Sequence, residues 1–225
     1  MQSKIEIIKT EDGSHSLYIP DMKETYHSTH GALRESEYVF IKNGLDLIKA
    51  NNEINILEVG FGTGLNTFLT FLESEKKALN VYYQTIEPYP LEENIFSALN
   101  YPDIIAPDKS RYFYDFHKAP FGEKVQFSKE FVFQKHFQKL EDLQLKPELL
   151  DLVYFDAFAP SKQPELWGLE NFEKIFGWMK KEGVIVSYCA SGQFKRNLKS
   201  AGFFVETIPG PPGKKEMTRG RKLLS

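Results

Sequence analysis

The sequence is poor in cysteine and has no long apolar run. Cys189 is the one cysteine among 225 residues, and a lone thiol forms neither an internal disulfide nor, by itself, a thiolate metal site. Redox chemistry through paired thiols is therefore excluded, and we expect no metal site. No apolar run reaches the roughly 18 residues of a membrane-spanning helix, and the start of the chain lacks the apolar stretch of a secretory signal. We expect a cytoplasmic protein without a membrane partner.

Internal repeats, low-complexity segments and linkers rich in Gly and Ser are also missing, so the sequence offers no domain boundary. Hydrophobic residues make up 41% and charged residues 26%, which is ordinary for a soluble globular chain. The length suits one large domain with a substantial core. We therefore expect residues 1–225 to form a single domain; the sequence leaves its oligomeric state open and is compatible with a monomer.

The net charge of −3 is small but unevenly distributed. Two acidic residues, Glu206 and Glu216, lie between positions 193 and 225. The same stretch contains eight basic residues: Lys195, Arg196, Lys199, Lys214, Lys215, Arg219, Arg221 and Lys222. It therefore carries +6, which leaves −9 on the first 192 residues. A basic face on an otherwise acidic protein is expected if that face meets RNA, although solvated cations on a terminal helix and strand would give the same count.

The first 30 residues read as a small extension before the main fold. Segments 5–8 and 16–19 could pair as a hairpin, because Asp12-Gly13 between them favours a tight turn. Apolar residues at helical spacing then predict a helix over residues 32–50. The extension is thus expected to be hairpin-like and to lead into a helix.

From residue 54 onward, apolar strand-like runs alternate with helical patterns. We predict strands at 54–59, 81–86, 150–155 and 184–188, helices at 65–72, 91–99, 170–180 and 194–200, and closing strands at 203–208 and 216–224. Alternation of this kind implies right-handed crossovers and a mostly parallel α/β sheet with helices on both faces. The aromatic-rich stretch 101–146, with a strand near 125–127, is expected to be an insertion that covers the active site.

A glycine-rich turn follows the first predicted strand of this sheet. It comprises Glu58, Val59, Gly60, Phe61, Gly62, Thr63 and Gly64, with Leu65 and Asn66 opening the next helix. Leu65 occupies the place of the third glycine of a dinucleotide-binding turn, and no Lys is present for a phosphate-binding loop. The acid-x-Gly-x-Gly-x-Gly pattern instead resembles the first motif of class I methyltransferases, whose loop wraps S-adenosylmethionine, and Glu58 would complement the positive charges of that ligand.

A second acid supports an adenosyl ligand. Glu87 ends the next predicted strand, 23 residues after Gly64, where an acid in Rossmann-like sheets accepts hydrogen bonds from ribose hydroxyls. The competing interpretation is a glycine turn at a helix start with two surface acids. The context of strand, loop and helix favours the cofactor site.

Asp156 directly follows the predicted strand at 150–155. In the assumed fold this strand end lies beside the transferable methyl group, so a carboxylate there could hold an amine substrate. An aliphatic amine has a pKa near ~10.4 and must lose its proton before it attacks. We expect Asp156 to act as general base or as an orienting acceptor. The alternative is a capping role in the loop that contains Pro160 and Pro164.

Five segments resemble, in order, successive motifs of one family, the methyltransferase domain of the tRNA 5-methylaminomethyl-2-thiouridine biosynthesis bifunctional protein. They are residues 26–40 with Gly31 and Glu35, the glycine turn 60–66, residues 155–164, residues 191–203 with Arg196, and residues 213–217. The resemblance covers nearly the whole chain. It implies a Rossmann-like class I fold with a seven-stranded sheet.

The resemblance also implies an activity. S-adenosylmethionine would methylate the primary amine of 5-aminomethyl-(2-thio)uridine at the tRNA wobble position, leaving S-adenosylhomocysteine, and the partner would be the tRNA anticodon region. Expected tRNA contacts are Lys162, Lys195, Arg196, Lys214 and Lys215. The bifunctional relatives carry a second, FAD-dependent domain, for which 225 residues leave no room. This chain is therefore expected to act alone, without FAD or metal, on an aminomethyl substrate made by other enzymes.

One departure from the family concerns adenine. Relatives place a Gly-Asp pair after the third strand to hold the adenine amino group, and the comparable stretch here reads Phe131-Val132-Phe133-Gln134. Gln134 or the backbone would substitute. Two other functions remain open: a methyltransferase for small amines or an aminopropyltransferase-like enzyme, and an RNA-binding pseudoenzyme. The sequence also leaves open which tRNAs are used, whether thiolation comes first, and whether Asp156 moves a proton.

Overall fold

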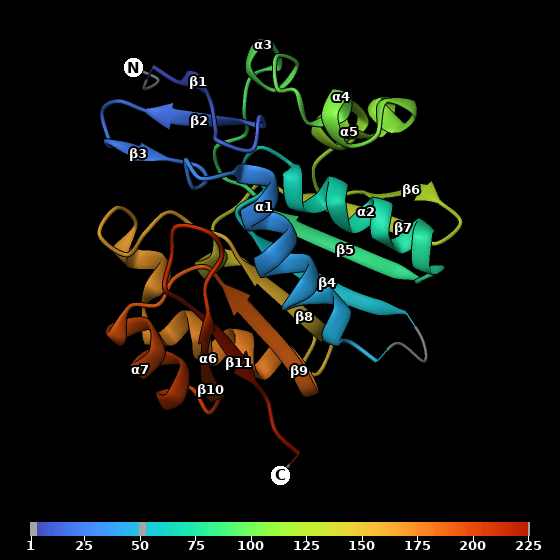
Figure 1. Cartoon of the computed structure of the whole chain (residues 1–225). Helices are drawn as coiled ribbons and strands as arrows, with labels where there is room; N and C mark the ends of the chain where they lie inside the picture. Colours follow the sequence, from blue (N-terminus) through green and yellow to red (C-terminus); the bar gives the residue numbers. More distant parts are fainter. Residues whose placement is uncertain (1–3, 50–52, 225) are drawn as a thin grey trace.

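An eight-stranded sheet forms the centre of the molecule in a computed structural model that describes residues 4–49 and 53–224 (Figure 1). Its strand order is β10 (Phe204–Pro209), β11 (Glu216–Arg221), β9 (Met179–Ser187), β8 (Leu150–Phe155), β4 (Ile54–Val59), β5 (Val81–Ile86), β7 (Phe131–His136) and β6 (Lys124–Ser128). Strands β9, β8, β4, β5 and β7 pair in parallel. The mostly parallel α/β fold is therefore confirmed.

The predicted number of seven strands is wrong by one. β6 folds back on β7 as an antiparallel edge strand, with a bulge between Gln126 and Ser128. β7 was not recognised as a strand because its aromatic residues were interpreted as part of a covering insertion. Phe131, Phe133 and Lys135 alternate with less buried residues along β7, the period of two expected of a strand.

The stretch 101–146 is largely part of the main fold and does not form a separate lid. Besides β6 and β7 it contains α4 (Tyr101–Ile105) and α5 (Ser110–Lys118). Phe113 and Phe116 of α5 are fully buried. The ring of Phe116 packs 5.6 Å from that of Phe71, which lies in α2 (Leu65–Lys77). The aromatic residues thus contribute burial to the core, as such residues usually do.

Helices cover both faces of the sheet, as predicted. One apolar cluster joins the sheet to α1 (Ala32–Ser36), a π-helical turn (Glu37–Lys42), α2 and α5. The other joins it to α6 (Leu169–Trp178) and α7 (Gly192–Ser200). Figure 1 shows α1 and α2 on the face towards the viewer. Every residue of β4 and β5 is buried, as expected for parallel strands covered on both sides.

The amino-terminal extension forms a small sheet of its own. β1 (Glu6–Lys9) pairs with β2 (His15–Ile19) as the predicted hairpin, with Ile7 opposite Leu17. A short third strand, β3 (Glu24–Thr25), adds to β2. This sheet lies beside the cavity described below and is not part of the central sheet.

Several predicted helices are shorter or broken. The helix expected at 32–50 is α1, then the π-helical turn, then a 3-10 turn at Leu45–Leu47; Ala50 lies outside the described residues. It breaks at Gly44, where any side chain would meet the carbonyl oxygen of Phe40. The helix expected at 91–99 is limited to α3 (Glu93–Phe96), and α6 ends at Trp178 because the chain is already extended as β9 from Met179.

No helix within residues 4–49 and 53–224 has both the length and the apolar character needed to cross a bilayer.

Candidate active site

A cavity opens at the carboxyl ends of β4, β5 and β8. Its walls are formed by the glycine turn at 60–63, residues 86–89 after β5, residues 139–141 after β7, residues 156–158 after β8, residues 163–166, and Tyr26, His27 and Tyr188. The chain crosses from β4 to β5 and β7 on one side and later to β8 and β9 on the other. Ligands of open α/β sheets bind at such a switch point.

The glycines of the turn have backbone angles that other residues rarely adopt. Gly60, Gly62 and Gly64 have φ of 94°, 51° and 74°. A Cβ on Gly60 would lie 2.5 Å from the carbonyl oxygen of Asp156, so the turn after β4 packs directly on the turn after β8. A Cβ on Gly62 would lie 3.3 Å from the ring of Tyr26. Side chains at Gly60 and Gly62 would therefore crowd these neighbours.

Glu87 lines the cavity and holds the glycine turn in place. Its Oε2 accepts a hydrogen bond of 2.9 Å from the Gly62 amide, and its Oε1 accepts one of 2.8 Å from the Tyr89 amide. Burial raises the pKa of Glu87, while these two amide donors act in the opposite direction. Each carboxylate oxygen has a second lone pair, so Glu87 can still accept from ligand hydroxyls.

Asp156 lies at the base of the cavity beside the glycine turn. Asn66, in the first turn of α2, donates a hydrogen bond of 2.7 Å from Nδ2 to Asp156 Oδ2. Burial raises the pKa of Asp156 to about 7, and the Asn66 hydrogen bond opposes the rise. Near neutral pH this carboxyl group therefore exists in both protonated and ionised forms, which suits a general base.

Glu58 was expected to face the cofactor, and the structure places it elsewhere. Its side chain is fully buried, is absent from the cavity wall, and accepts a hydrogen bond of 3.1 Å from the Thr67 hydroxyl of α2. Burial raises the pKa of Glu58 to about 8, so the group is mainly protonated at pH 7. It cannot supply the expected counter-charge, because β4 is buried on both faces and Glu58 lies beneath the turn.

Gln134 does not reach the cavity either. Its side-chain amide Nε2 donates a hydrogen bond of 2.8 Å to the Gly122 carbonyl, and its Oε1 accepts one from the Tyr82 hydroxyl. Because β7 extends to His136, the loop after the third strand begins only at Phe137. That loop brings Glu141 into the cavity wall, where its buried Oε2 has no hydrogen-bond partner among the described residues. The overlooked signal in the sequence is an acid, Glu141, five residues after a strand in which aromatic residues alternate with others.

Aromatic side chains form the remaining walls. Phe61 and Thr63 line the cavity as predicted for residues of the turn. The rings of Tyr26 and Phe158 meet edge to face with centroids 4.9 Å apart. Tyr26, His27, Phe158 and Tyr188 were not singled out as site residues, because the extension and β9 meet at the cavity only in the folded chain. Burial lowers the pKa of His27 to about 4, so this ring is neutral.

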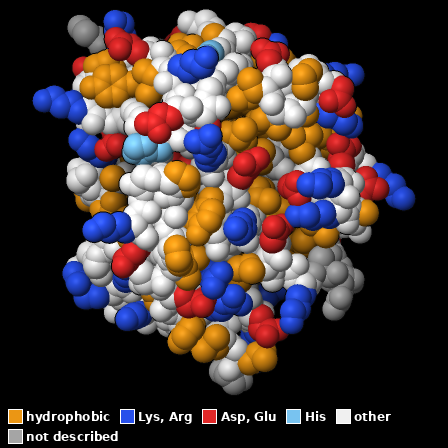
Figure 2. Space-filling view, viewed as in Figure 1, with side chains coloured by type: hydrophobic (Ala, Val, Ile, Leu, Met, Phe, Trp, Pro, Cys, Tyr) orange, Lys and Arg blue, Asp and Glu red, His pale blue; other side chains and the backbone are white. Residues whose placement is uncertain are grey.

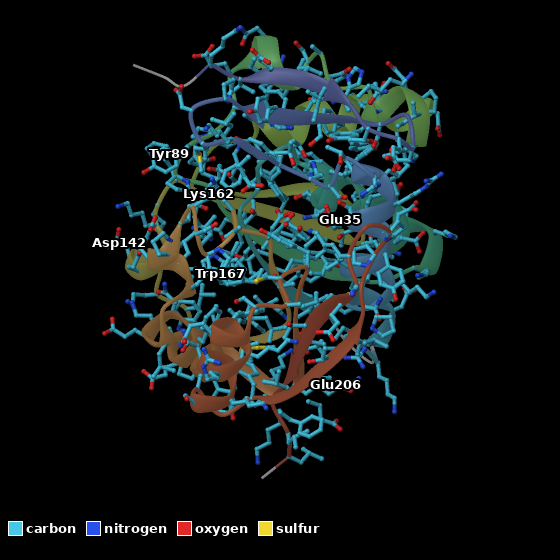
Figure 3. The ribbon with its side chains drawn as sticks, turned by 60° about the vertical axis from the view of Figure 1, so that its left-hand side comes forward. Glu35, Tyr89, Asp142, Lys162, Trp167 and Glu206 are labelled. Carbon is cyan, nitrogen blue, oxygen red and sulfur yellow. The ribbon has the colours of Figure 1, made fainter. Side chains whose placement is uncertain are left out.

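Three of the five cations predicted to contact tRNA have a partner within the protein. Lys162 donates 2.6 Å to the Met22 carbonyl, Lys195 pairs with Glu216 at 3.1 Å, and Lys214 pairs with Glu35 at 2.6 Å. Arg196 donates 2.8 Å to the side-chain oxygen of Gln193 and remains exposed, as does Lys215. Figure 3 labels Lys162 and also Tyr89, an exposed residue that lines the cavity.

The rest of the basic carboxyl-terminal stretch is also partly neutralised. Arg219 and Arg221 both pair with Glu206, at 2.8 and 3.0 Å. Lys222 donates to the carbonyl oxygens of Phe176 and Met179. Figure 2 shows Lys and Arg side chains interspersed with Asp and Glu side chains on the face drawn. The charge asymmetry of the sequence is therefore only partly available at the surface.

In the part of the chain that the structure describes, no group of three or more His, Cys, Asp or Glu side chains is arranged to hold a metal ion.

Comparisons with known proteins agree with this geometry. Residues 116–223 match the sequence model of a family described as S-adenosyl-L-methionine-dependent methyltransferases. A tRNA 5-methylaminomethyl-2-thiouridine biosynthesis bifunctional protein MnmC from Campylobacter hominis is 29% identical over 90% of this chain and 31% of its own length. The corresponding protein from Idiomarina loihiensis is 30% identical over 89% of this chain and 36% of its own length. The chain thus spans about a third of these curated relatives.

Solved structures are similar over nearly the whole chain. The crystal structure of MNMC2 from Aquifex aeolicus has a TM-score of 0.77 and 30% identity, and the match covers 97% of this chain and 70% of that one. A spermidine synthase in complex with the transition state analogue AdoDATO has a TM-score of 0.60 at 13% identity over 99% of this chain and 71% of that one. At that identity the second likeness concerns the fold alone.

Proposed function

The chain belongs to the family of S-adenosyl-L-methionine-dependent methyltransferases that includes MNMC2 from Aquifex aeolicus, and we propose that it methylates a tRNA wobble uridine. The substrate is the primary amine of 5-aminomethyl-(2-thio)uridine, and the products are 5-methylaminomethyl-(2-thio)uridine and S-adenosylhomocysteine. The observation that carries this proposal is the direct packing of the glycine turn on Asp156, which brings a cofactor loop and an amine-binding carboxylate to one cavity.

The cavity fits S-adenosylmethionine. Glu87 offers acceptors for ribose hydroxyls, and the unpartnered Oε2 of Glu141 offers one for the adenine amino group. The glycines of the turn carry no side chains, so its backbone can approach the methionine part closely. When bound, S-adenosylmethionine would supply the methyl group: the lone pair of the substrate nitrogen would form the new bond to carbon, and the electron pair of the broken bond would remain on sulfur.

Asp156 holds the amine and accepts its proton. Asn66 donates to Oδ2, and Oδ1 is the atom to which an ammonium group in the cavity would donate. Proton transfer from an amine of pKa near ~10.4 to a carboxyl group whose pKa is about 7 is uphill by roughly 5 kcal/mol. For an Asp with an ordinary pKa of 3.8 the same transfer would be uphill by roughly 9 kcal/mol. Burial therefore makes Asp156 a stronger base, and the proton then passes to water.

The aromatic walls suit a base removed from the anticodon loop. Tyr26, Phe158 and Tyr188 can pack against a uracil ring and exclude water around the amine. RNA-modifying enzymes commonly read unstacked bases in this way. Such a base must leave the stack of the anticodon loop before the site can act on it. The place of action that we propose is the cytoplasm, where tRNA takes part in translation.

Exposed cations close to the cavity can contact the tRNA backbone. The side chain of Asn197 in α7 donates 2.8 Å to the Trp167 carbonyl, so α7 adjoins the loop that lines the cavity. The ion pair of Lys195 with Glu216 brings α7 next to the loop that carries Lys215. We assign Arg196 and Lys215 to phosphate contacts, since both are exposed.

The proposal is tested with labelled S-adenosylmethionine and tRNA from cells that lack this activity, followed by nucleoside analysis. Label should appear on 5-methylaminomethyl-(2-thio)uridine, and Asp156→Asn should abolish it. Asp103→Asn, which changes an exposed acid on α4, is the matched control and should remain active. Label on a free polyamine with none on tRNA would favour the small-amine alternative. The pseudoenzyme would be favoured if neither the wild type nor Asp156→Asn methylated anything and both bound tRNA equally well.

A further inference from the structure

We propose that Lys214 is a positioning residue of the methyl-transfer site and not a phosphate contact. The inference rests on the proposed function and concerns the same cavity. Lys214 lies in the loop that joins β10 to β11, which rises beside α1 (Figure 1).

The ammonium group of Lys214 is directed into the protein by a buried carboxylate. Nζ lies 2.6 Å from Glu35 Oε1, and the Glu35 side chain is only 6% exposed. The second oxygen, Oε2, accepts a hydrogen bond of 2.7 Å from the Ser28 amide. Figure 3 shows Glu35 beside this loop. Glu35 is the buried member of the pair and requires such a partner, and the Lys214 side chain is 32% exposed. The pair therefore fixes the direction of the Lys214 ammonium group.

The same ammonium group lies over an aromatic ring of the cavity. Nζ is 3.8 Å from the ring centroid of Tyr188, within the range of a cation–π contact. The Tyr188 hydroxyl donates 2.8 Å to the carbonyl of Ala157, the residue after Asp156. Both Tyr188 and Asp156 line the cavity. Lys214 therefore acts on the backbone that carries the catalytic carboxylate through one intervening ring.

The loop that presents Lys214 is closely held. The Gly210 amide donates 3.1 Å to the Lys215 carbonyl, and the Tyr38 hydroxyl donates 3.1 Å to the Pro209 carbonyl. Gly213 adopts φ of 85° and packs so tightly on His30 that a Cβ would overlap the imidazole ring. The loop is thus held against α1 and the 28–31 segment by contacts within the protein.

The expected consequence is a defect in turnover with normal tRNA binding. Without Lys214, the Tyr188 ring loses its covering charge and the position of residues 156–157 is less constrained. A displacement of about 1 Å at a reacting group can cost on the order of 100-fold in rate. We therefore expect Lys214→Met to lower kcat by roughly 10- to 100-fold and to change KM for tRNA less than about twofold.

The experiment compares kcat, KM and tRNA binding over a range of salt concentrations. Lys214→Arg should retain kcat within about fivefold, because a guanidinium group can both pair with a carboxylate and stack on an aromatic ring. Lys42→Met is the control, since Lys42 also lies over an aromatic ring, that of Tyr38 at 5.4 Å, but outside the cavity, and its kcat should be unchanged. Lys215→Met should instead weaken tRNA binding and reduce the salt slope by about one.

A second variant guards against misfolding. Glu35→Gln keeps the volume and the acceptor for the Ser28 amide but removes the negative charge that directs Lys214, so it should show the same kcat defect. The double variant should be no slower than the slower single variant, because the two residues act as a unit.

Two results would overturn the inference. A Lys214→Met protein that keeps its kcat but binds tRNA about tenfold more weakly, with a smaller salt slope, makes Lys214 a phosphate contact. Normal kcat in a folded Glu35→Gln protein also overturns it. If the wild-type protein does not methylate tRNA, the proposed function fails and the inference fails with it, whereas an active wild type with an equally active Lys214→Met refutes the inference alone.

Discussion

The hydrogen bond from Asn66 to Asp156 allows a quantitative test of the general base. Asn66→Ala removes the one amide donor on Asp156 Oδ2, at 2.7 Å, and alanine is a good helix former, so α2 should be preserved. Burial raises the pKa of Asp156 to about 7 in the wild-type protein, and the Asn66 amide favours the ionised form. Without that donor the carboxylate is harder to form, so the pKa must rise further.

The size of the shift follows from the strength of the bond. Hydrogen bonds to charged groups contribute roughly 1.5–3 kcal/mol, and one pKa unit corresponds to about 1.4 kcal/mol. Asn66→Ala should therefore raise the pKa of Asp156 by about one to two units. The acid limb of kcat/KM should move from near pH 7 to about pH 8–9, and the rate at pH 7 should fall roughly 5- to 50-fold.

The assay measures initial rates of methyl transfer to tRNA between pH 5.5 and about 10, with the tRNA and S-adenosylmethionine concentrations low enough to report kcat/KM. Asn55→Ala is the matched control: Asn55 is a buried asparagine at the opposite end of β4, 7% exposed. Its acid limb should stay near pH 7. An Asn66→Ala limb that also stays near pH 7, with a uniformly lower rate, would show that Asp156 is not the titrating group.

Three further predictions concern the cofactor side and stability. Gly60→Ala places a methyl group 2.5 Å from the Asp156 carbonyl oxygen, so Tm and the affinity for S-adenosylmethionine in calorimetry should both fall, the affinity at least about tenfold. Glu141→Ala should raise the Kd for S-adenosylmethionine roughly tenfold, whereas Asp142→Ala, which changes an exposed neighbouring acid, should leave it unchanged. Equal effects of the two substitutions would mean that Glu141 does not contact S-adenosylmethionine. Burial raises the pKa of Glu58 to about 8 from 4.5, so the folded protein keeps a proton that the unfolded chain releases, and stability falls as pH rises between these values. Relative to Glu58→Gln, the wild type should lose about 3 kcal/mol of unfolding free energy in urea between pH 5 and 7.5, and parallel pH curves would contradict the buried, protonated state.

Part of the site could be predicted from sequence because its chemistry is local. A continuous apolar run predicted β4, β5 and β8, and the glycines after β4 predicted a turn with left-handed backbone angles. Glu87 and Asp156 were found because each follows a recognisable strand. All parallel strands end at the same edge of the sheet, so these features had to meet there.

Other expectations failed because the position of a side chain relative to the cavity is decided only when the strands pack together. Glu58 belongs to the same turn in sequence, but burial of β4 on both faces places it beneath the cavity. Gln134 was assigned to the adenine site because β7 was not recognised as a strand. β7 ends only at His136, so the loop that reaches the cavity begins after it and contains Glu141. An error in one strand end is enough to select the wrong side chain.

The sequence by itself determined the class of the fold, the glycine turn after β4 and the carboxylate after β8, since these depend on apolar periodicity, on glycine and on position along one segment. Only the tertiary structure decided which charges are available. Lys214 and Glu35 are 179 positions apart, yet they form one ion pair, and three further cations of the basic carboxyl-terminal stretch also pair with acids: Lys195, Arg219 and Arg221. Pairing between distant residues depends on the packing of whole elements, and no local pattern in the sequence contains that information.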